Sequence, residues 1–192
     1  MAKKNIADNI FAFVPITTQT VLGTHIRGRA NFMALGWLTR INFNPPMIAV
    51  GVNKNNASCQ GIVDCREFSL NIPSADQAPA ADYTGLVSAR QADKSNLFEI
   101  FYGKLKSAPM IVDFPVNVEC QVVQQLELPT NFCFIGEIVA VHAEEAVLTN
   151  DAPDPEKFRP LLLSMPDNRF WTLGECVGRA WNEGKKFREV IE

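Results

Sequence analysis

The chain has 192 residues, of which 47% are hydrophobic, so it carries enough apolar surface for a core and is predicted to form a single domain over residues 1–192. Its 18 Lys and Arg are nearly balanced by 21 Asp and Glu, which gives a formal net charge of −3. A general nucleic-acid-binding protein carries a basic excess, so the charge balance argues against that class.

Cysteine usage and hydropathy favour a cytoplasmic protein. The five cysteines are odd in number and form no Cys-x-x-Cys pair, which is typical of reduced thiols. No apolar run approaches the roughly 18 residues that a helix needs to cross a bilayer, so no membrane association is expected. The two histidines and the scattered cysteines lack the spacing of a zinc site, so no metal is expected.

The first third of the chain is rich in strand-forming residues. Residues 13–20 are β-branched and aromatic, Gly23-Thr24 offers a turn, and residues 26–31 follow, which predicts an opening hairpin. The breaker pair Pro45-Pro46 then precedes an apolar run over residues 47–52, which predicts a buried strand.

The next region alternates between short helices and a strand. Residues 53–56 interrupt the buried strand, and Ser58 is expected to cap a short helix. Apolar and polar residues alternate over residues 67–72, which predicts a strand with one face in water. Ser74 and Gln77 match a capping box, so another short helix is expected to begin there, with Pro79 near its start.

The clearest strand signal lies in the second half. Even positions from 116 to 128 are mostly apolar, and Val123 and Gln124 break the phase as a β-bulge does. Residues 132–142 follow a short turn and predict the second strand of a hairpin, whereas residues 150–160 predict an exposed loop. Strands dominate without regular βαβ alternation, so an antiparallel barrel with a few short helices is predicted.

Two early segments combine polar amides with aromatic residues or a lysine. Asn31-Phe32-Met33-Ala34-Leu35-Gly36-Trp37 is an Asn-x-x-Ala segment followed by a small residue and Trp, although a strand of this composition is also typical of a core. Asn53-Lys54-Asn55-Asn56-Ala57-Ser58 offers polar side chains, one lysine and the amides of a helix start, which suit either a phosphate or an ordinary polar turn.

Two later segments contain motifs with characteristic intervals between their residues. Residues 82–94 contain Gly-x-x-Ser-x(4)-Asp-Lys, built from Gly85, Ser88, Asp93 and Lys94, and the alternative interpretation is a solvated helix end with an ion pair. Residues 170–185 form an aromatic-x-x-Gly-x(3)-Gly-x-Ala-x(3)-Gly-Lys tail, in which Phe170 or Trp171 can cover a ring face.

Together, these segments resemble the flavin reductase-like FMN-binding family, and within it the flavoredoxin branch, over roughly residues 13–184. The resemblance implies a mainly β, FMN-binding split β-barrel of antiparallel Greek-key type, which cycles a non-covalent FMN in electron transfer. It assigns the flavin ring to Asn31, Phe32, Met33, Ala34, Leu35, Tyr83, Thr84 and Gly85, the phosphate and ribityl chain to Asn53, Lys54, Ser58 and Lys94, and adds Ser88, Asn131 and Trp171 to the cofactor-binding set.

One position departs from the pattern of the family's NADH-dependent reductases. Many of them carry Gly-Asp-His where this chain has Pro129-Thr130-Asn131, so Asn131 stands at the position of the imidazole that meets the nicotinamide. His25 and His142 are expected to be surface residues and do not replace it. No residue is expected to act as a general acid or base.

The resemblance leaves the electron donor open. A flavoredoxin-like carrier reduced by a partner protein is favoured by Asn131, an NAD(P)H:flavin oxidoreductase is the second hypothesis, and a flavin-free β-barrel binding module is the third. The family also implies a homodimer whose two FMN sites lie near the subunit interface.

Overall fold

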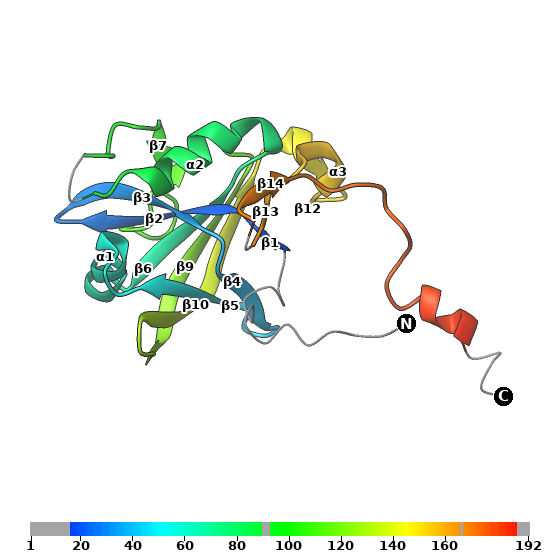
Figure 1. Ribbon diagram of the computed structural model, residues 1–192, viewed down its shortest axis with the longest axis horizontal. Helices are drawn as coiled ribbons and strands as arrows, with labels where there is room; N and C mark the ends of the chain where they lie inside the picture. Colours follow the sequence, from blue (N-terminus) through cyan, green and yellow to red (C-terminus); the bar gives the residue numbers. More distant parts are fainter. Residues whose placement is uncertain (1–15, 90–92, 166, 188–192) are drawn as a thin grey trace.

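The computed structural model describes residues 16–89, 93–165 and 167–187, and its main feature is a seven-stranded antiparallel sheet (Figure 1). Neighbouring strands in this sheet follow the order β3-β2-β6-β9-β10-β5-β4. The predicted antiparallel, mainly β fold is therefore confirmed. The strands are β2 Thr20–Ile26, β3 Arg29–Leu35, β4 Leu38–Asn42, β5 Met47–Asn53, β6 Glu67–Ile72, β9 Val116–Glu127 and β10 Asn131–Ala143.

Chain connectivity requires this sheet to curl into a barrel. The strands β3 and β4 lie at opposite ends of the strand order, yet only Gly36 and Trp37 separate them in sequence. A flat sheet of seven strands would hold its edges about 29 Å apart, since neighbouring strands are spaced at about 4.8 Å. The step from Leu35 to Leu38 spans at most about 11 Å. The two edges therefore approach each other where β3 passes into β4. Because β3 and β4 do not pair with each other, the barrel is split between them.

Smaller elements decorate the barrel. A three-stranded sheet and two short strand pairs join it, and α2 lies along β3 (Figure 1). These elements are β1 Ile16–Thr18, β13 Leu162–Ser164 and β14 Arg169–Trp171; the pairs β7 Ile100–Phe101 with β8 Met110–Ile111 and β11 Leu148–Thr149 with β12 Ala152–Pro153; and the helices α1 Ala57–Cys65, η2 Ala75–Gln77, α2 Ala78–Leu86, η3 Glu145–Val147, α3 Pro155–Phe158 and η4 Glu183–Phe187.

The core consists of two buried clusters. One, around Phe68 and Phe134, packs the strands of the large sheet against Ile62 of α1. The other, around Phe32 and Phe114, packs β2 and β3 against Ala81 of α2. Helix α1 therefore belongs to the first cluster and α2 to the second. Both helices are too short to be stable by themselves, so apolar contacts with the barrel hold them in place.

Several local predictions are confirmed. The strand predicted over residues 47–52 is β5, although only Val50 and Val52 of it are buried. The capping box of Ser74 and Gln77 begins η2, which leads into α2 with Pro79 in its first turn. The strands β9 and β10 form the predicted hairpin. Their register shifts at Val123, because Gln124 pairs with Ile135 whereas Val122 pairs with Gly136, so the bulge is also confirmed.

The predicted turn at Gly23-Thr24 is wrong. Both residues lie inside β2, and the hairpin turns instead at Arg27-Gly28, where both residues have positive φ angles, 53° and 75°. Such a two-residue turn matches the twist of paired strands. Gly23 serves a different purpose, because a Cβ there would collide with the Pro109 carbonyl oxygen and the Ser69 hydroxyl.

Three further local predictions need correction. The strand β6 has no face in water, because Ser69 and Asn71 are fully buried beneath the segment around Pro109. Ser58 does not cap α1; Asn56 is the N-cap residue, without a side-chain cap, and Ser58 lies inside the helix. Residues 150–160 are largely exposed as predicted, but they also contain β12 and the single turn of α3.

Candidate functional site

A pocket of about 520 Å³ opens at the split of the barrel. The β3–β4 connection forms one wall of the pocket, and the β13–β14 hairpin forms the other. The start of the loop after β5 closes one end. It brings together strands that are distant in sequence. The lining residues are Gln19, Met33, Ala34, Leu35, Gly36, Trp37, Gly51, Asn53, Asn56, Asp82, Asn131, Leu163, Met165, Asn168 and Phe170.

Neutral amides provide most of the polar lining. Asn53 Oδ1 accepts from the Asn55 amide at 2.9 Å, and Asn131 Oδ1 accepts from the Thr130 hydroxyl at 2.9 Å. Asn56 Nδ2 lies 3.2 Å from Met33 Sδ. Each of these local bonds occupies only part of the amide's capacity, so donors remain for a ligand. Asp82 is the single charged residue among the lining residues.

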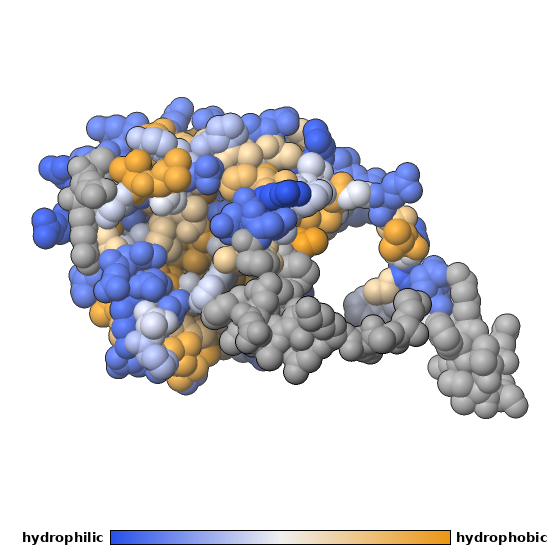
Figure 2. Space-filling model, in the orientation of Figure 1, coloured by the Kyte–Doolittle hydropathy of each residue, from blue (hydrophilic) through white to orange (hydrophobic). Residues whose placement is uncertain are grey.

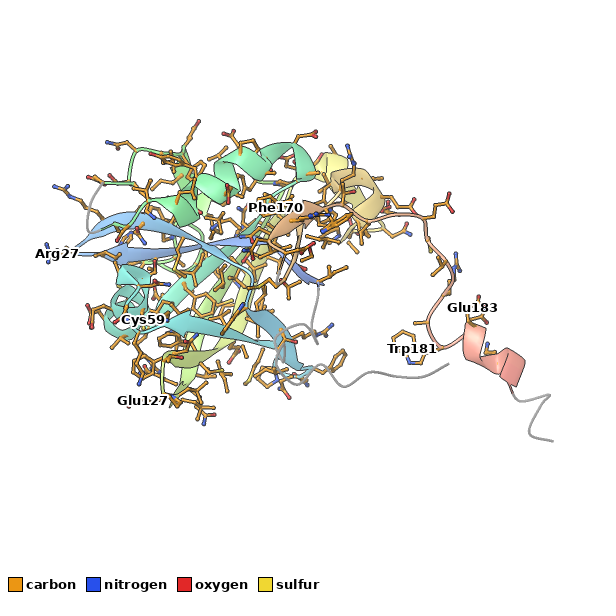
Figure 3. The ribbon with its side chains drawn as sticks, in the orientation of Figure 1. Arg27, Cys59, Glu127, Phe170, Trp181 and Glu183 are labelled. Carbon is orange, nitrogen blue, oxygen red and sulfur yellow. The ribbon has the colours of Figure 1, made fainter. Side chains whose placement is uncertain are left out.

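Aromatic side chains form the apolar part of the pocket. Trp37 lies over Gly51 of β5, since a Cβ at Gly51 would sit 3.5 Å from the Trp37 ring. Phe170 of β14, labelled in Figure 3, also lines the pocket. A planar conjugated ring packs well against such side chains, and the missing side chain at Gly51 lets Trp37 lie close to the strand.

A buried polar pair lies at the base of α1, next to the pocket residues Asn53 and Asn56. Asn31 of β3 is only 3% exposed, and its Nδ2 donates to Ser58 Oγ at 2.8 Å. Its Oδ1 has no hydrogen-bond partner within the described residues. Buried polar atoms are nearly always paired, so this oxygen marks a position where a donor is absent. The first turn of α1 carries no side-chain cap and no acidic residue.

The two predicted lysines do not line the pocket. Lys54 Nζ pairs with Glu127 at 2.6 Å and lies over the Phe132 ring. Lys94 is 6% exposed, and its Nζ donates to the carbonyl oxygens of Thr84 and Val87 at the end of α2. Burial lowers the pKa of Lys94. Both charges are thus used within the fold, and their contact with a phosphate stays a prediction.

The remaining predicted residues lie around the pocket rather than in its lining. Phe32 is fully buried in the second core cluster, and Thr84 is buried with its hydroxyl on the Ala81 carbonyl. Gly85 lets α2 approach β3, because a Cβ there would lie 3.0 Å from Ala34 Cβ. Trp171 donates to Ser164 Oγ at 2.7 Å while its neighbour Phe170 lines the pocket. Tyr83 and Ser88 are exposed, and residues 90–92 of the third motif lie outside the described residues.

The residues of the sequence motifs therefore overlap in part with the lining of the pocket, and their contact with a cofactor stays a prediction. Five predicted residues share the pocket, namely Met33, Ala34, Leu35, Asn53 and Asn131. Gln19, Leu163 and Asn168 were missed, because they lie in or next to the separate β1-β13-β14 sheet and reach the pocket only through the tertiary fold. Gly51 carried a usable signal, since a glycine inside an otherwise apolar strand indicates a close approach.

A second buried polar network lies outside the pocket. Glu119 of β9 is fully buried, and its carboxylate accepts from the amides of Lys104 and Leu105 at 3.1 and 2.7 Å and lies 2.8 Å from His142 Nε2. Burial alone would raise the pKa of Glu119, but the hydrogen bonds from His142 and the two amides outweigh it, so the pKa lies below its usual value. This network holds the 103–105 loop on the sheet.

Two absences concern the described part of the chain. None of its helices is long and apolar enough to cross a membrane. Across residues 16–89, 93–165 and 167–187, no group of three or more His, Cys, Asp or Glu side chains is placed to hold a metal ion.

This architecture is similar to that of known proteins. Residues 15–165 match the family model described as flavin reductase like domain. A flavoredoxin from Methanosarcina acetivorans is 48% identical, with a TM-score of 0.93 over 97% of this chain and 100% of that one. Flavoredoxin of Desulfovibrio vulgaris (Miyazaki F) is 30% identical, with a TM-score of 0.86 over 95% of this chain and 100% of that one.

More distant curated relatives are matched over part of their length. An NADH-dependent FAD reductase of Streptomyces globisporus is 24% identical over 65% of this chain and 66% of that protein. The chain likewise spans 65% of an uncharacterized protein of Archaeoglobus fulgidus. The family model covers most of the barrel, including the β3–β4 wall of the pocket and β13. The chain therefore belongs to the flavin reductase-like domain family.

Proposed function

We propose that the chain binds FMN non-covalently in the pocket at the barrel split and works as a flavoredoxin-like electron-transfer protein. The observation that carries this proposal is the pocket itself, which combines Trp37 and Phe170 with a set of neutral amides. Its volume of about 520 Å³ lies within the usual range for small-molecule sites. The similarity to two flavoredoxins supports the same conclusion.

The residues present fit the two ends of FMN. The uncapped first turn of α1, beside Asn53 and Asn56, offers backbone donors and the positive end of the helix dipole, which suit the phosphate. The unpaired Asn31 Oδ1 suits a hydroxyl donor such as those of the ribityl chain. Trp37 and Phe170 suit the faces or edges of the ring.

FMN supplies reversible one- and two-electron chemistry when bound, and the chain supplies binding and orientation. The amides of Asn53 and Asn131 can donate to a carbonyl-rich ring edge without carrying charge themselves. Trp37 and Leu163 line the apolar part of the pocket. Asp82 is the single titratable residue among the lining residues.

For the electron donor we propose a partner protein, with NAD(P)H as the second candidate. Asn131 lines the pocket and accepts from the Thr130 hydroxyl through its Oδ1. By the family resemblance, this amide stands where many NADH-dependent members carry an imidazole. The NADH-dependent relative from Streptomyces globisporus favours the second candidate. Anaerobic NADH added to the FMN-loaded protein separates the two: rapid bleaching selects the reductase, and an unchanged spectrum selects the carrier.

The binding proposal is tested by a spectrum. Protein incubated with FMN and freed of excess is expected to retain flavin absorbance, and Trp37→Ala is expected to weaken FMN binding about tenfold, the equivalent of about 1.4 kcal/mol. Val141→Ala, which changes an exposed residue of β10 outside the pocket lining, serves as the matched control. A colourless wild-type protein would select the third hypothesis, a flavin-free binding module.

We also propose that the protein works as a homodimer. Large apolar side chains remain exposed beside the pocket, and such patches mark interaction surfaces. Sedimentation of the full chain at micromolar concentration is expected to give the mass of two chains.

A further inference from the structure

The ion pair of Lys54 and Glu127 joins two segments that meet at the end of the β9–β10 hairpin. The Lys54 Nζ atom lies 2.6 Å from Glu127 Oε1 and 5.3 Å from the centre of the Phe132 ring. The backbone amide of Lys54 donates to the Thr130 carbonyl at 3.0 Å, so the lysine is anchored beside the hairpin turn. Glu127 and Phe132 are partners in the β9–β10 ladder, so their side chains lie on one face of the hairpin.

This ion pair is open to water and easily separated. The side chain of Glu127 is 69% exposed and that of Lys54 is 29% exposed. Figure 2 shows a largely hydrophilic surface at this end of the molecule, over α1 and the end of the β9–β10 hairpin. An exposed ion pair contributes little to stability, so a stronger anion can replace the carboxylate. The contact with the Phe132 ring needs no carboxylate, and it keeps the ammonium in place when Glu127 leaves.

The ammonium of Lys54 lies beside the start of α1. Its charge reaches Cys59 in the first turn, because burial raises the pKa of the Cys59 thiol and the Lys54 ammonium opposes that rise. Cys59 and Glu127 are labelled at the same end of the molecule in Figure 3. The first amides of a helix have no partner within it, and the first turn of α1 has neither a side-chain cap nor an acidic residue. An anion here meets backbone donors, the helix dipole and one ammonium.

A second, independent observation concerns the same helix start. Ser58, in the first turn of α1, accepts from Asn31 Nδ2 at 2.8 Å. Asn31 is 3% exposed, and its Oδ1 has no hydrogen-bond partner within the described residues. A ligand that carries hydroxyl groups next to a phosphate brings a donor for Asn31 and an anion for the helix start. FMN has both groups, whereas riboflavin has the hydroxyl groups alone.

We propose that Glu127 is a displaceable counter-ion of Lys54: the phosphate of the bound flavin takes the place of the carboxylate, and the ion pair thereby selects phosphorylated over unphosphorylated flavin. A phosphate monoester carries a charge of about −1.5 to −2 near neutral pH, against a single charge on a carboxylate, and it also accepts from the helix amides. Without a ligand, Glu127 neutralises Lys54 and leaves no unpaired charge beside α1. This inference rests on the proposed binding of FMN and specifies what decides which flavin is bound.

The first test compares FMN with riboflavin, which differ only in the phosphate. Dissociation constants are measured for each flavin by fluorescence titration of the full chain. Lys54→Met is expected to weaken FMN binding about tenfold, the scale of one charge-assisted hydrogen bond, and to leave riboflavin binding unchanged. Glu127→Gln frees the ammonium and is expected to tighten FMN binding about threefold, the scale of an exposed ion pair, again without effect on riboflavin. Glu145→Gln makes the same charge change at an exposed position of η3 outside the pocket lining and is the matched control.

The double variant Lys54→Met/Glu127→Gln tests whether Glu127 acts through the lysine. The gain in FMN affinity from Glu127→Gln is expected to disappear when Lys54 is replaced. An equal gain in both backgrounds shows that Glu127 repels the phosphate directly, and it overturns the exchange. A Glu127→Gln chain that binds FMN no more tightly than the wild type, or that gains equally for both flavins, overturns it as well. Circular dichroism checks that each variant is folded, as expected for changes at an exposed pair.

Inorganic phosphate separates failure of this inference from failure of the proposed function. The melting temperature of the flavin-free chain is compared in phosphate and in chloride at equal ionic strength. Phosphate is expected to raise it in the wild type and further in Glu127→Gln, but not in Lys54→Met, because an anion that binds the folded chain stabilises it.

The outcomes divide as follows between the two proposals. A wild-type chain that binds neither flavin, yet shows this pattern with phosphate, overturns the binding of FMN and supports the displaceable ion pair. A chain that binds FMN with equal affinity in the wild type, Lys54→Met and Glu127→Gln overturns the ion-pair exchange alone. A chain that responds to neither flavin nor phosphate overturns both.

Discussion

Two buried polar regions of the same barrel differ in how completely their hydrogen bonds are made. On one side, Asn71 donates to the Val21 carbonyl and accepts from the Ile111 amide and from Asn117, and nearby Glu119 accepts from two amides and His142. At the base of α1, Asn31 donates to Ser58 but its Oδ1 has no partner in the described structure. In the first region the buried polar groups find their hydrogen-bond partners within the protein, whereas in the second region Asn31 Oδ1 lacks a donor.

The difference teaches how to tell a structural polar group from a ligand-binding one. Completed buried networks hold segments together, and their loss leaves several groups unpaired. An incomplete one costs stability in the isolated chain and is relieved by a ligand that brings the missing donor. Substitutions on the two sides should therefore affect different properties: stability on the Glu119 side and cofactor affinity on the Asn31 side.

The largest effect is expected for Glu119→Ala. It removes a buried carboxylate that accepts from two partly buried backbone amides and from His142, and the loss of these several bonds costs about 3–5 kcal/mol in all. Urea denaturation measures the loss in unfolding free energy. Glu127→Ala, at the exposed pair with Lys54, is the control and is expected to change it by less than about 1 kcal/mol.

A somewhat smaller loss is expected for Asn71→Leu. The leucine keeps the volume but removes the acceptor of the Ile111 backbone amide, the side-chain donor to the Val21 carbonyl and one of the two acceptors of Asn117 Nδ2, at a cost of about 2–4 kcal/mol. Thermal and urea unfolding both report it. A loss below about 1 kcal/mol would show that water or a shifted side chain completes this network, and would remove the contrast with Asn31.

Acid should weaken the Glu119 side. The pKa of Glu119 is lower in the folded chain than its usual 4.5, so the folded state favours the carboxylate and gains stability above that value. This contribution is lost as the pH falls from about 4.5 through the lower, folded pKa. Unfolding free energy measured from pH 6 to pH 3 is expected to fall less steeply in Glu119→Gln than in the wild type. Equal slopes would show that Glu119 is not held as a carboxylate.

The smallest effect on stability is expected for Asn31→Leu. It removes one neutral hydrogen bond to Ser58 together with an unpaired buried oxygen, so the unfolding free energy should change by less than about 1 kcal/mol. FMN affinity should fall about tenfold, because the acceptor for the ribityl chain is gone. Equilibrium dialysis with FMN measures the affinity. A large loss of stability with unchanged FMN affinity would reverse the comparison between the two regions.

Local sequence patterns were sufficient where neighbouring residues decide the structure. The β9–β10 hairpin, its bulge at Val123 and the capping box at Ser74 depend on alternation and on hydrogen bonds within a few residues. Motif spacing also identified five pocket residues, because Met33 to Leu35, Asn53 and Asn131 stand beside the β3–β4 connection or at the ends of strands. It did not identify Gln19 or Asn168, which come from other parts of the chain.

What the sequence determined by itself was the antiparallel, mainly β character and the resemblance to flavin-binding barrels, because alternation and motif spacing are local. Tertiary structure decided the rest. The short step from β3 to β4 brings the two edges of the sheet together and forms the pocket at the split between them, and burial beneath the Pro109 segment turns the predicted wet face of β6 into a hydrogen-bonded interior. Lys94, a plausible phosphate ligand by spacing, is drawn to the carbonyls that end α2. Burial and hydrogen-bond completion depend on segments distant in sequence, and no local pattern records which of them meet.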